Sequence, residues 1–290
     1  MKKEFLTGLL VVTMCLSSVA CSGNKGGGSS GNGSGSGNSG SGSKESKVED
    51  TIVNTDYFDM HKAGPNMELS GLSEKGKKQE NLVIPAGAII TGTIIDGVVK
   101  NVSFESDDDM DINMLVSTST TLETIKLPAN ITSLDGLAFS CCTNLKEIVL
   151  PKGITVIPDL CFMSDESLKT VTIEGDVTEI CSMAFYDCAS LESINLPDSI
   201  TTIGDSAFFG CESLSTITLP KGLKTIGSAA FITKSGIKTI NVPAELELET
   251  WDSGGFIQSE ARYTVKLTEG SWADIHFDEV FQGQVTKEYV

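Results

Sequence analysis

A 23-residue pattern occurs five times in succession between Leu122 and Gly236, without insertion or deletion. Each repeat has Leu at position 1, Ile or Val at position 4, Leu or Ile at position 6, aliphatic residues at positions 10 and 13, and Phe at position 18. A fixed period with one apolar skeleton is typical of a solenoid, because a single repeat cannot bury its apolar side chains alone. The repeats begin at Leu122, Leu145, Leu168, Leu191 and Leu214, and a partial sixth begins at Ile237.

The spacing inside a repeat predicts one short β-strand per coil. Positions 4 and 6 are two residues apart and face the same side of a strand, whereas position 1 has the wrong parity to join them. The strand therefore spans about positions 3 to 7, with positions 4 and 6 inward and positions 3 and 5 outward. Proline ends it at position 7, because proline cannot donate to the ladder. These prolines are Pro128, Pro151, Pro197, Pro220 and Pro243, and Glu174 is the one departure.

Strands one coil apart must run parallel, so we predict one continuous parallel β-sheet. The return segments, predicted to be irregular or short-helical, carry positions 10 and 13 and an Ala-Phe pair such as Ala207-Phe208. Each apolar position is worth about 1.5 to 3 kcal/mol on full burial. This offsets the ordering of the coil only when both neighbouring coils are present. Stability is therefore expected to be a property of the stack.

The repeat continues upstream in degenerate form. Val99, Val102 and Phe104 reproduce positions 1, 4 and 6, and Val99 lies 23 residues before Leu122. Residues 82–85 match positions 4 to 7 of a still earlier coil. We therefore divide this part of the chain into an N-terminal region with an opening coil (48–98) and a leucine-rich solenoid (99–248).

Residues 249–290 are predicted to cap the last coil, since an open solenoid end exposes apolar side chains and an unpaired strand edge. Residues 263–267 alternate like a strand. Ser271 and Asp274 resemble a capping box that opens a helix from Trp272 to Phe281, and Gly283 stands where the helix would stop. A final strand at 284–290 could complete the cap.

The first twenty residues resemble an export signal, because two lysines precede an apolar run and small residues precede Cys21. The apolar run is short for a membrane span. Its end resembles the bacterial lipoprotein cleavage box, which implies that Cys21 is the lipidated N-terminus. Ordinary secretion after Ala20, with Cys21 as a free thiol, is the alternative. Residues 21–47 are almost entirely Gly, Ser and Asn and are predicted to form a disordered tether.

The repeat from Leu191 to Leu214, LxxIxLPxxIxxIxxxAFxxCxSL, resembles the BspA-like leucine-rich repeats of bacterial surface proteins. The resemblance covers about residues 99–248. It implies a leucine-rich repeat solenoid that binds proteins at the cell surface. The departures from the pattern concern local packing and are Glu174, Cys161 in place of alanine, and Lys234 in place of cysteine.

The chain is strongly acidic, with 39 Asp and Glu residues against 21 Lys and Arg residues. Removal of residues 1–20 takes away two lysines and one glutamate, so the net charge of −18 becomes −19. Such a protein repels polyanions, which argues against nucleic acid binding and against electrostatic docking to anionic lipid. We expect a membrane contact only through the lipid on Cys21.

Six cysteines lie in the repeats of a chain whose export would permit disulfides. Cys142, Cys188 and Cys211 share position 21, and they recur with the repeat as small buried residues do, so we interpret them as packed thiols. A disulfide between Cys188 and Cys211 remains open, because equivalent positions in adjacent coils lie about 5 Å apart. No Cys-x-x-Cys pair suggests a zinc site. The other repeat cysteines are Cys141, Cys161 and Cys181.

The sequence offers no catalytic constellation, so we expect no enzyme activity, no cofactor and no metal site. Both histidines, His61 and His276, lie outside the repeats. Asp274, His276 and Asp278 are two residues apart along the predicted helix and therefore do not share a face. The acidic run 107–111 holds oxygen ligands that calcium prefers, but it lacks the spaced ligands and turn glycine of a calcium loop. A solvated acidic turn is the favoured interpretation.

The outward positions 3 and 5 form the candidate binding face. They are polar, mostly uncharged and free of the aromatic residues that stack on sugar rings. Threonine suits exposed strand positions for conformational reasons, so a purely structural role is one interpretation. A flat recognition surface, as in leucine-rich repeats generally, is the other. The residues are Thr124, Lys126, Glu147, Val149, Thr170, Thr172, Ser193, Asn195, Thr216, Thr218, Thr239 and Asn241.

We therefore expect an exported, lipid-anchored, monomeric protein that acts as a non-catalytic binding or adhesion module on the bacterial cell surface. The expected partner is a protein, either from a host or from the cell's own envelope. The alternative is a structural or accessory lipoprotein that holds a neighbouring envelope protein. A hydrolase or metal-dependent enzyme is the least favoured hypothesis.

Overall fold

The structure is a computed structural model of the 290-residue chain, and it describes residues 57–63, 66–85, 88–90, 98–104, 118–233, 236–251, 262–281 and 283–290. The chain divides into two compact units, Met1–Val53 and Asn54–Val290, and every described residue belongs to the second. The predicted leader, Cys21, the tether and the acidic run 107–111 lie outside the described residues.

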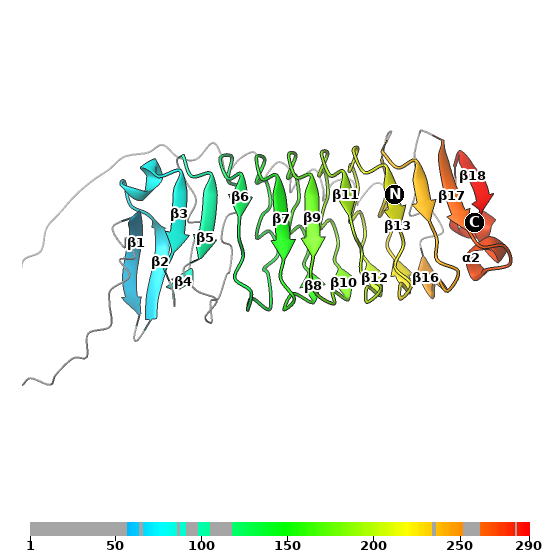
Figure 1. Ribbon diagram of the computed structural model, residues 1–290, viewed down its shortest axis with the longest axis horizontal. Coiled ribbons are helices and arrows are strands. Elements are labelled where there is room, and N and C mark those ends of the chain that lie inside the picture. The colour runs from blue at the N-terminus through cyan, green and yellow to red at the C-terminus, as the bar shows by residue number, and fades with distance from the viewer. Residues whose placement is uncertain are drawn as a thin grey trace, which may run out of the picture. The chain divides into compact units, whose positions relative to one another are not determined.

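Each coil contributes one strand to a row of parallel strands (Figure 1). Equivalent residues of adjacent coils pair in register, as Glu147 does with Thr170. The predicted solenoid of 23-residue coils is confirmed, but the sheet predicted to be continuous is divided into two between β11 and β13, which are not paired by backbone hydrogen bonds. The six-stranded sheet contains β3 (Asn81–Ile84), β5 (Asn101–Phe104), β6 (Thr124–Ile125), β7 (Glu147–Leu150), β9 (Thr170–Ile173) and β11 (Ser193–Ile194). The four-stranded sheet contains β13 (Thr216–Thr218), β15 (Thr239–Asn241), β17 (Tyr263–Leu267) and β18 (Val285–Tyr289).

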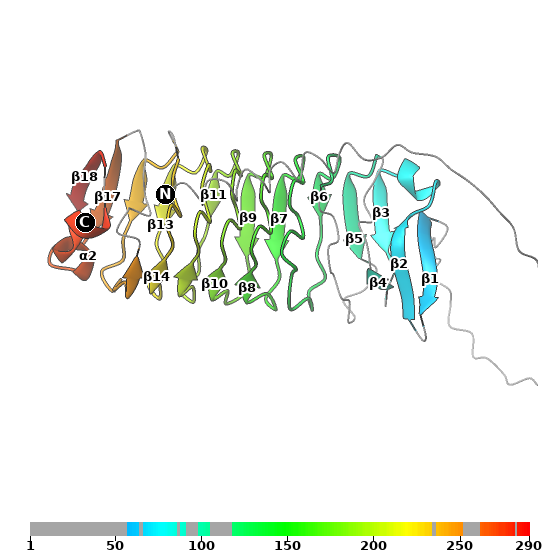
Figure 2. The same cartoon turned by 180° about the vertical axis from the view of Figure 1, so that it is seen from behind.

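A second parallel sheet runs through the return segments, where the sequence predicts irregular or short-helical structure (Figure 2). Four of its strands occupy positions 12 and 13 of their coils, with the position 13 isoleucine buried. Two-residue strands show no alternation from which a sequence pattern could reveal them. The strands are β8 (Val156–Ile157), β10 (Glu179–Ile180), β12 (Thr202–Ile203), β14 (Thr225–Ile226) and β16 (Thr250–Trp251).

The apolar positions of the repeat fill the interior of each coil. In β7, Ile148 and Leu150 are buried while Glu147 and Val149 are exposed, which confirms the predicted inward and outward positions. The position 18 phenylalanines are fully buried and stack in one column, with ring centroids 5.1 to 5.2 Å apart. The column joins each coil to its neighbours, so its contacts exist only in the stack. Its members are Phe139, Phe162, Phe185, Phe208 and Phe231.

The turns after the second sheet place residues other than glycine in the left-handed region. Such a conformation costs about 1 to 3 kcal/mol per residue. Hydrogen bonds between coils offset this cost, because alternate N–H groups of the turn donate to carbonyls of the next coil, as Phe162 N–H does to Ala184 O at 2.8 Å. Position 16 has positive φ in all five regular coils, in Leu137 (67°), Leu160 (61°), Met183 (56°), Ser206 (54°) and Ala229 (57°).

The N-terminal end of the solenoid carries a small sheet of its own. β1 (Phe58–Ala63) pairs antiparallel with β2 (Asn66–Leu72), and β2 pairs parallel with β4 (Ala88–Ile90). The short 3-10 helix η2 (Gly76–Lys78) follows β2. Phe58, Leu69 and Leu72 join the common core, so these elements close the apolar end of the stack.

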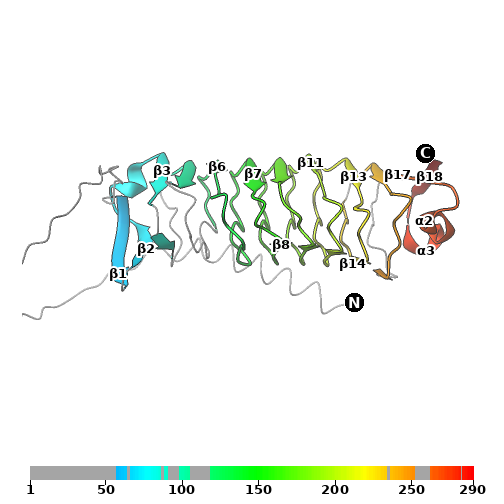
Figure 3. The same ribbon diagram turned by 60° about the horizontal axis from the view of Figure 1, so that its bottom comes forward.

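The C-terminal end is closed by β17, β18 and two short helices (Figure 3). Ala273, Phe277 and Val280 of the helices are buried, so these side chains close the core. α2 (Trp272–Ile275) begins at Ser271, whose hydroxyl accepts a hydrogen bond from the Asp274 N–H at 3.3 Å, as the capping box predicts.

The single helix predicted from Trp272 to Phe281 is wrong in one respect, because the chain breaks at His276 (φ −98°, ψ 19°) and continues as α3 (Phe277–Val280). The predicted stop at Gly283 has positive φ (97°), and the predicted final strand is β18. In the described part of the chain, no helix has both the length and the apolar composition needed to cross a membrane.

Candidate functional site

The outward side chains at positions 3 and 5 form one continuous surface, which we call the sheet face. Nine of the twelve predicted residues are exposed, and Thr124, Thr239 and Asn241 are half-buried. Ten lie within strands, while Lys126 and Asn195 directly follow β6 and β11. The fold therefore brings all twelve to the same side of the solenoid.

Strand pairing arranges the sheet face in two straight rows. In the position 3 row, Thr124 lies opposite Glu147, Glu147 opposite Thr170, and Thr170 opposite Ser193. Neighbouring strands are about 4.8 Å apart, so each row presents a side chain at that interval. The result is a regular lattice of hydroxyl and amide groups.

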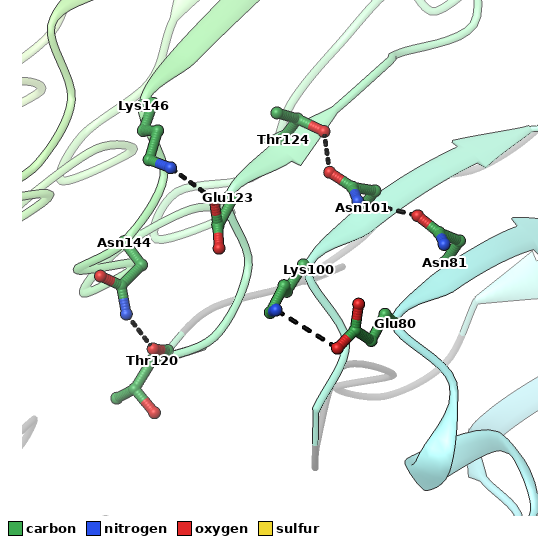
Figure 4. Close-up of polar contacts among 9 residues, drawn as sticks. All are labelled: Glu80, Asn81, Lys100, Asn101, Thr120, Glu123, Thr124, Asn144 and Lys146. Carbon is green, nitrogen blue, oxygen red and sulfur yellow. Dashed lines mark hydrogen bonds and ion pairs between the residues drawn. The ribbon is translucent and has the colours of Figure 1, made fainter.

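The position 3 row extends beyond the predicted residues at its N-terminal end. The Asn101 amide donates to Asn81 Oδ1 at 2.8 Å, and the Thr124 hydroxyl donates to Asn101 Oδ1 at 2.7 Å (Figure 4). The sequence contained the signal for Asn101, because it directly precedes Val102 at position 4 of its coil.

The rows also continue past the last predicted residue, through β17 and β18. Thr239 pairs with Thr264, which pairs with Thr286, and Asn241 pairs with Lys266 in the other row. These strands were predicted to belong to the cap, because their sequences depart from the repeat pattern that defines the face. The sheet face is therefore longer than the repeat that predicted it.

Position 2 of the coils adds a row of opposite charges beside the lattice. Glu80 pairs with Lys100 at 3.3 Å, and Lys146 pairs with Glu123 (Figure 4). The hydrogen bond and the charge of Lys146 lower the pKa of the Glu123 carboxyl. A third pair, Lys169 with Glu192 at 3.4 Å, joins the next two coils. Exposed pairs of this kind contribute about 0 to 1 kcal/mol each to the free energy of unfolding. They therefore affect the charge pattern of the surface more than the stability of the fold.

Much of the lattice has unused hydrogen-bonding capacity. Across the described ranges, five side chains in its centre make no hydrogen bond to another protein group, whereas Asn241 Nδ2 donates to Thr218 Oγ1 at 3.1 Å. Their hydroxyl and amide groups are free to bond to water or to a partner. These five residues are Thr170, Thr172, Ser193, Asn195 and Thr216.

The sheet face is close to electrically neutral in a protein of net charge −18. Lysines and acidic residues alternate over positions 2, 3 and 5, so neither sign dominates. A partner therefore meets little of the chain's negative charge on this face, because charges more than about 8 Å away are largely screened at physiological salt. The lysines are Lys100, Lys126, Lys146, Lys169, Lys238 and Lys266, and the acidic residues are Glu80, Glu123, Glu147, Glu192 and Glu288.

In the described part of the cap, His276 contacts Glu279 and Trp272 and not Asp274. His276 Nδ1 lies 3.2 Å from Glu279 Oε2, and its ring packs against Trp272 with centroids 4.6 Å apart. Asp274 instead accepts hydrogen bonds from Lys287 Nζ at 2.7 Å and Tyr289 Oη at 3.0 Å. Over the ranges that the structure describes, no three His, Cys, Asp or Glu residues are grouped as metal ligands. His61 lies in β1.

The Asp274 contacts fasten β18 to α2. The hydrogen bond from Lys287 is the main cause that lowers the pKa of the Asp274 carboxyl, and the same bond raises the pKa of Lys287. The Lys287 ammonium also lies 4.3 Å from the centroid of the Phe277 ring. Asp274 is therefore a structural residue of the cap.

The repeat cysteines are free thiols in the structure, including Cys188 and Cys211. Cys142, Cys161, Cys188 and Cys211 are buried, which agrees with their interpretation as packed thiols. Burial raises the pKa of each of these four thiols. Cys141 and Cys181 are half-buried, and burial raises the pKa of Cys181 to about 11.

One buried acid was missed in the sequence analysis. Asp165 occupies position 21, where the equivalent residues Cys142, Cys188 and Cys211 are cysteines, and it is fully buried. The aligned repeats contain this exception, but the chemistry of a buried carboxyl became visible only with the packing around it.

Solved structures similar to this chain include leucine-rich repeat proteins of bacteria. The T. pallidum leucine-rich repeat protein TpLRR is 20% identical (72% of this chain, 83% of that chain, TM-score 0.36). The pneumococcal vaccine antigen PcpA is 16% identical (73% and 68%, TM-score 0.42). A leucine-rich cell surface protein of Faecalibacterium prausnitzii is 15% identical (77% and 89%, TM-score 0.37).

No curated protein sequence matches the chain. The family model described as "BspA type Leucine rich repeat region" matches residues 99–191 and 178–272, in six copies. The matched segments span more than half of the chain and contain the twelve predicted residues of the sheet face. The chain therefore belongs to the BspA-type leucine-rich repeat family.

Proposed function

We propose that this protein is a non-catalytic binding module whose sheet face docks a protein partner. The observation that carries the proposal is the central part of the lattice, where five exposed polar side chains from three adjacent coils share one side of the solenoid and make no hydrogen bond within the described protein. A rigid array of this kind binds without prior ordering of loops, which lowers the entropic cost of association. Membership of a leucine-rich repeat family supports a protein as the ligand.

The proposed location is the outer surface of a bacterial cell. The export signal predicted for residues 1–20, the lipidation site predicted at Cys21 and the Gly/Ser tether 21–47 support it. A tether of about 25 Gly-rich residues has a reach of roughly 25 to 30 Å, enough to present the solenoid away from the membrane. A monomer is proposed, because one chain already supplies the whole face.

The proposal is tested by capture with residues 48–290 displayed without the anchor. Host matrix proteins and an extract of the producing cell's own envelope serve as two separate sources of partner. We expect Thr172→Arg combined with Thr218→Arg to abolish capture while leaving the melting transition nearly unchanged, because both side chains are exposed on the sheet face.

A matched control places the same charges on the return side of the coils, as Thr155→Arg, directly before β8, combined with Thr202→Arg in β12. This control is expected to capture partner like the unmodified chain. Capture that survives the sheet-face substitutions would show that the lattice is not the site. Capture from the host source supports adhesion, whereas capture from the envelope extract alone supports the accessory role.

A further inference from the structure

Position 21 of the repeats carries a buried thiol in three coils and a buried carboxyl in one. Asp165 is fully buried, and its Oδ1 accepts a hydrogen bond from the Cys142 N–H at 2.7 Å. Its other oxygen, Oδ2, is buried and has no hydrogen-bond partner among the described residues. A buried carboxylate in this condition is strongly disfavoured, whereas a neutral carboxylic acid is tolerated.

The neighbouring coils show which group the Asp165 side chain replaces. The Cys188 thiol donates to the Phe162 carbonyl at 3.0 Å, and the Cys211 thiol donates to the Phe185 carbonyl at 3.2 Å. Phe139 stands in the same register relative to Asp165, so its carbonyl corresponds to the carbonyls that accept from the two thiols. A carboxylate cannot donate a hydrogen bond, but a carboxylic acid can, so only the protonated form has the donor that the thiols use.

Among the described residues, no positively charged group acts on Asp165. The titratable groups that interact with it are the thiols of Cys142, Cys161 and Cys188, and the pKa of each is raised by burial. Burial also raises the pKa of Asp165 well above its usual range, and the one opposing influence is the hydrogen bond from the Cys142 N–H. No lysine, arginine or histidine contributes to this shift.

We propose that protonation of Asp165 controls local opening of the solenoid at residues 160–168. In the closed coil Asp165 is a neutral acid. When the segment opens, Asp165 loses its proton to solvent. The opening segment lies in the coil that also carries Glu147 and Val149 of the sheet face. The inference rests on the buried side chain and does not depend on the proposed binding function.

The direction of the pH dependence follows from the two states. In the open coil Asp165 meets water and titrates near its ordinary pKa of about 3.9. In the closed coil it holds the proton to a higher pH. Above pH 4, and up to the raised pKa of the closed state, each pH unit therefore favours opening by up to about tenfold. Below pH 4 both states are protonated, and Asp165 makes no difference.

Amide hydrogen exchange of the full chain tests the inference, because the Phe162 and Ser164 N–H groups bond to the next coil and exchange only when it opens. The exchange rate of segment 160–168 is compared at each pH between the unmodified chain and Asp165→Asn, which cannot ionise. The ratio of the two rates cancels the intrinsic pH dependence of exchange. We expect it to rise by up to about tenfold per pH unit above pH 4, until the pH reaches the raised pKa of the closed coil.

The equivalent segment two coils later, 206–214, contains Cys211 and serves as the internal control. Its ratio is expected to stay constant with pH. Asp165→Cys restores the residue of the neighbouring coils and gives a second comparison if the asparagine variant folds poorly. A flat ratio in segment 160–168 with both variants overturns the inference. An equal rise in both segments also overturns it, because the opening would then be global.

Discussion

Replacement of Phe185 by leucine should destabilise the solenoid more than the same replacement of Phe139. Phe185 stacks on Phe162 and Phe208, with centroids 5.1 and 5.2 Å away, whereas the sequence places Val116 rather than an aromatic ring one coil before Phe139. A stacked aromatic pair is worth about 0.5 to 1.5 kcal/mol beyond its buried area. Phe185→Leu therefore loses about 1 to 3 kcal/mol of stacking, and Phe139→Leu loses about half of that.

Urea unfolding of the two variants measures the difference as a change in midpoint at unchanged m-value. A double-mutant cycle of Phe162→Leu and Phe185→Leu isolates the contact between the two rings, and the expected coupling is about 0.5 to 1.5 kcal/mol. Equal destabilisation by Phe139→Leu and Phe185→Leu, together with zero coupling, would refute the claim that the aromatic column joins neighbouring coils.

Three further perturbations probe local packing. Gly153→Ala should lower Tm, because its Cβ would lie 2.3 Å from the Ile131 carbonyl oxygen; an unchanged Tm would contradict this close approach. Asp274→Asn should weaken the attachment of β18 and abolish an acid step in its hydrogen exchange. The Asp274 carboxylate stabilises the attachment of β18, and its lowered pKa keeps it ionised above about pH 4. The stabilisation is lost as the pH falls below about 4 and the carboxylate takes up a proton. Native Cys211 should resist iodoacetamide until urea is added, and Cys181 should react slowly at pH 8 because its pKa is about 11; rapid labelling of either thiol would contradict its burial.

The main strands and the capping box were predictable because their signals are local and periodic. Alternation at positions 3 to 6 placed Ile148 and Leu150 inside, and Ser271 identified the start of α2. The sequence gives less indication of features that exist only between coils. The two-residue strands of the second sheet are held by their neighbours, and Leu160 adopts positive φ (61°) where glycine would be the usual marker.

The candidate site was predictable to a similar extent. The twelve residues of the sheet face follow from parity within the repeat, and they lie together in the structure. The extension through Asn101 and Thr264 was missed, because the flanking strands depart from the repeat pattern that defined the face. The unpaired oxygen of Asp165 depends on which groups surround it in three dimensions, and no sequence pattern states that.

The most direct test of the central claim is site-specific photo-crosslinking of the protein to its partner on the producing cell and on host matrix. A photoreactive residue is placed at Thr172 on the sheet face or at Thr202 on the second sheet, since neither side chain is buried. The account predicts a crosslinked protein adduct from position 172 and none from position 202. An adduct formed from position 202 alone would contradict it.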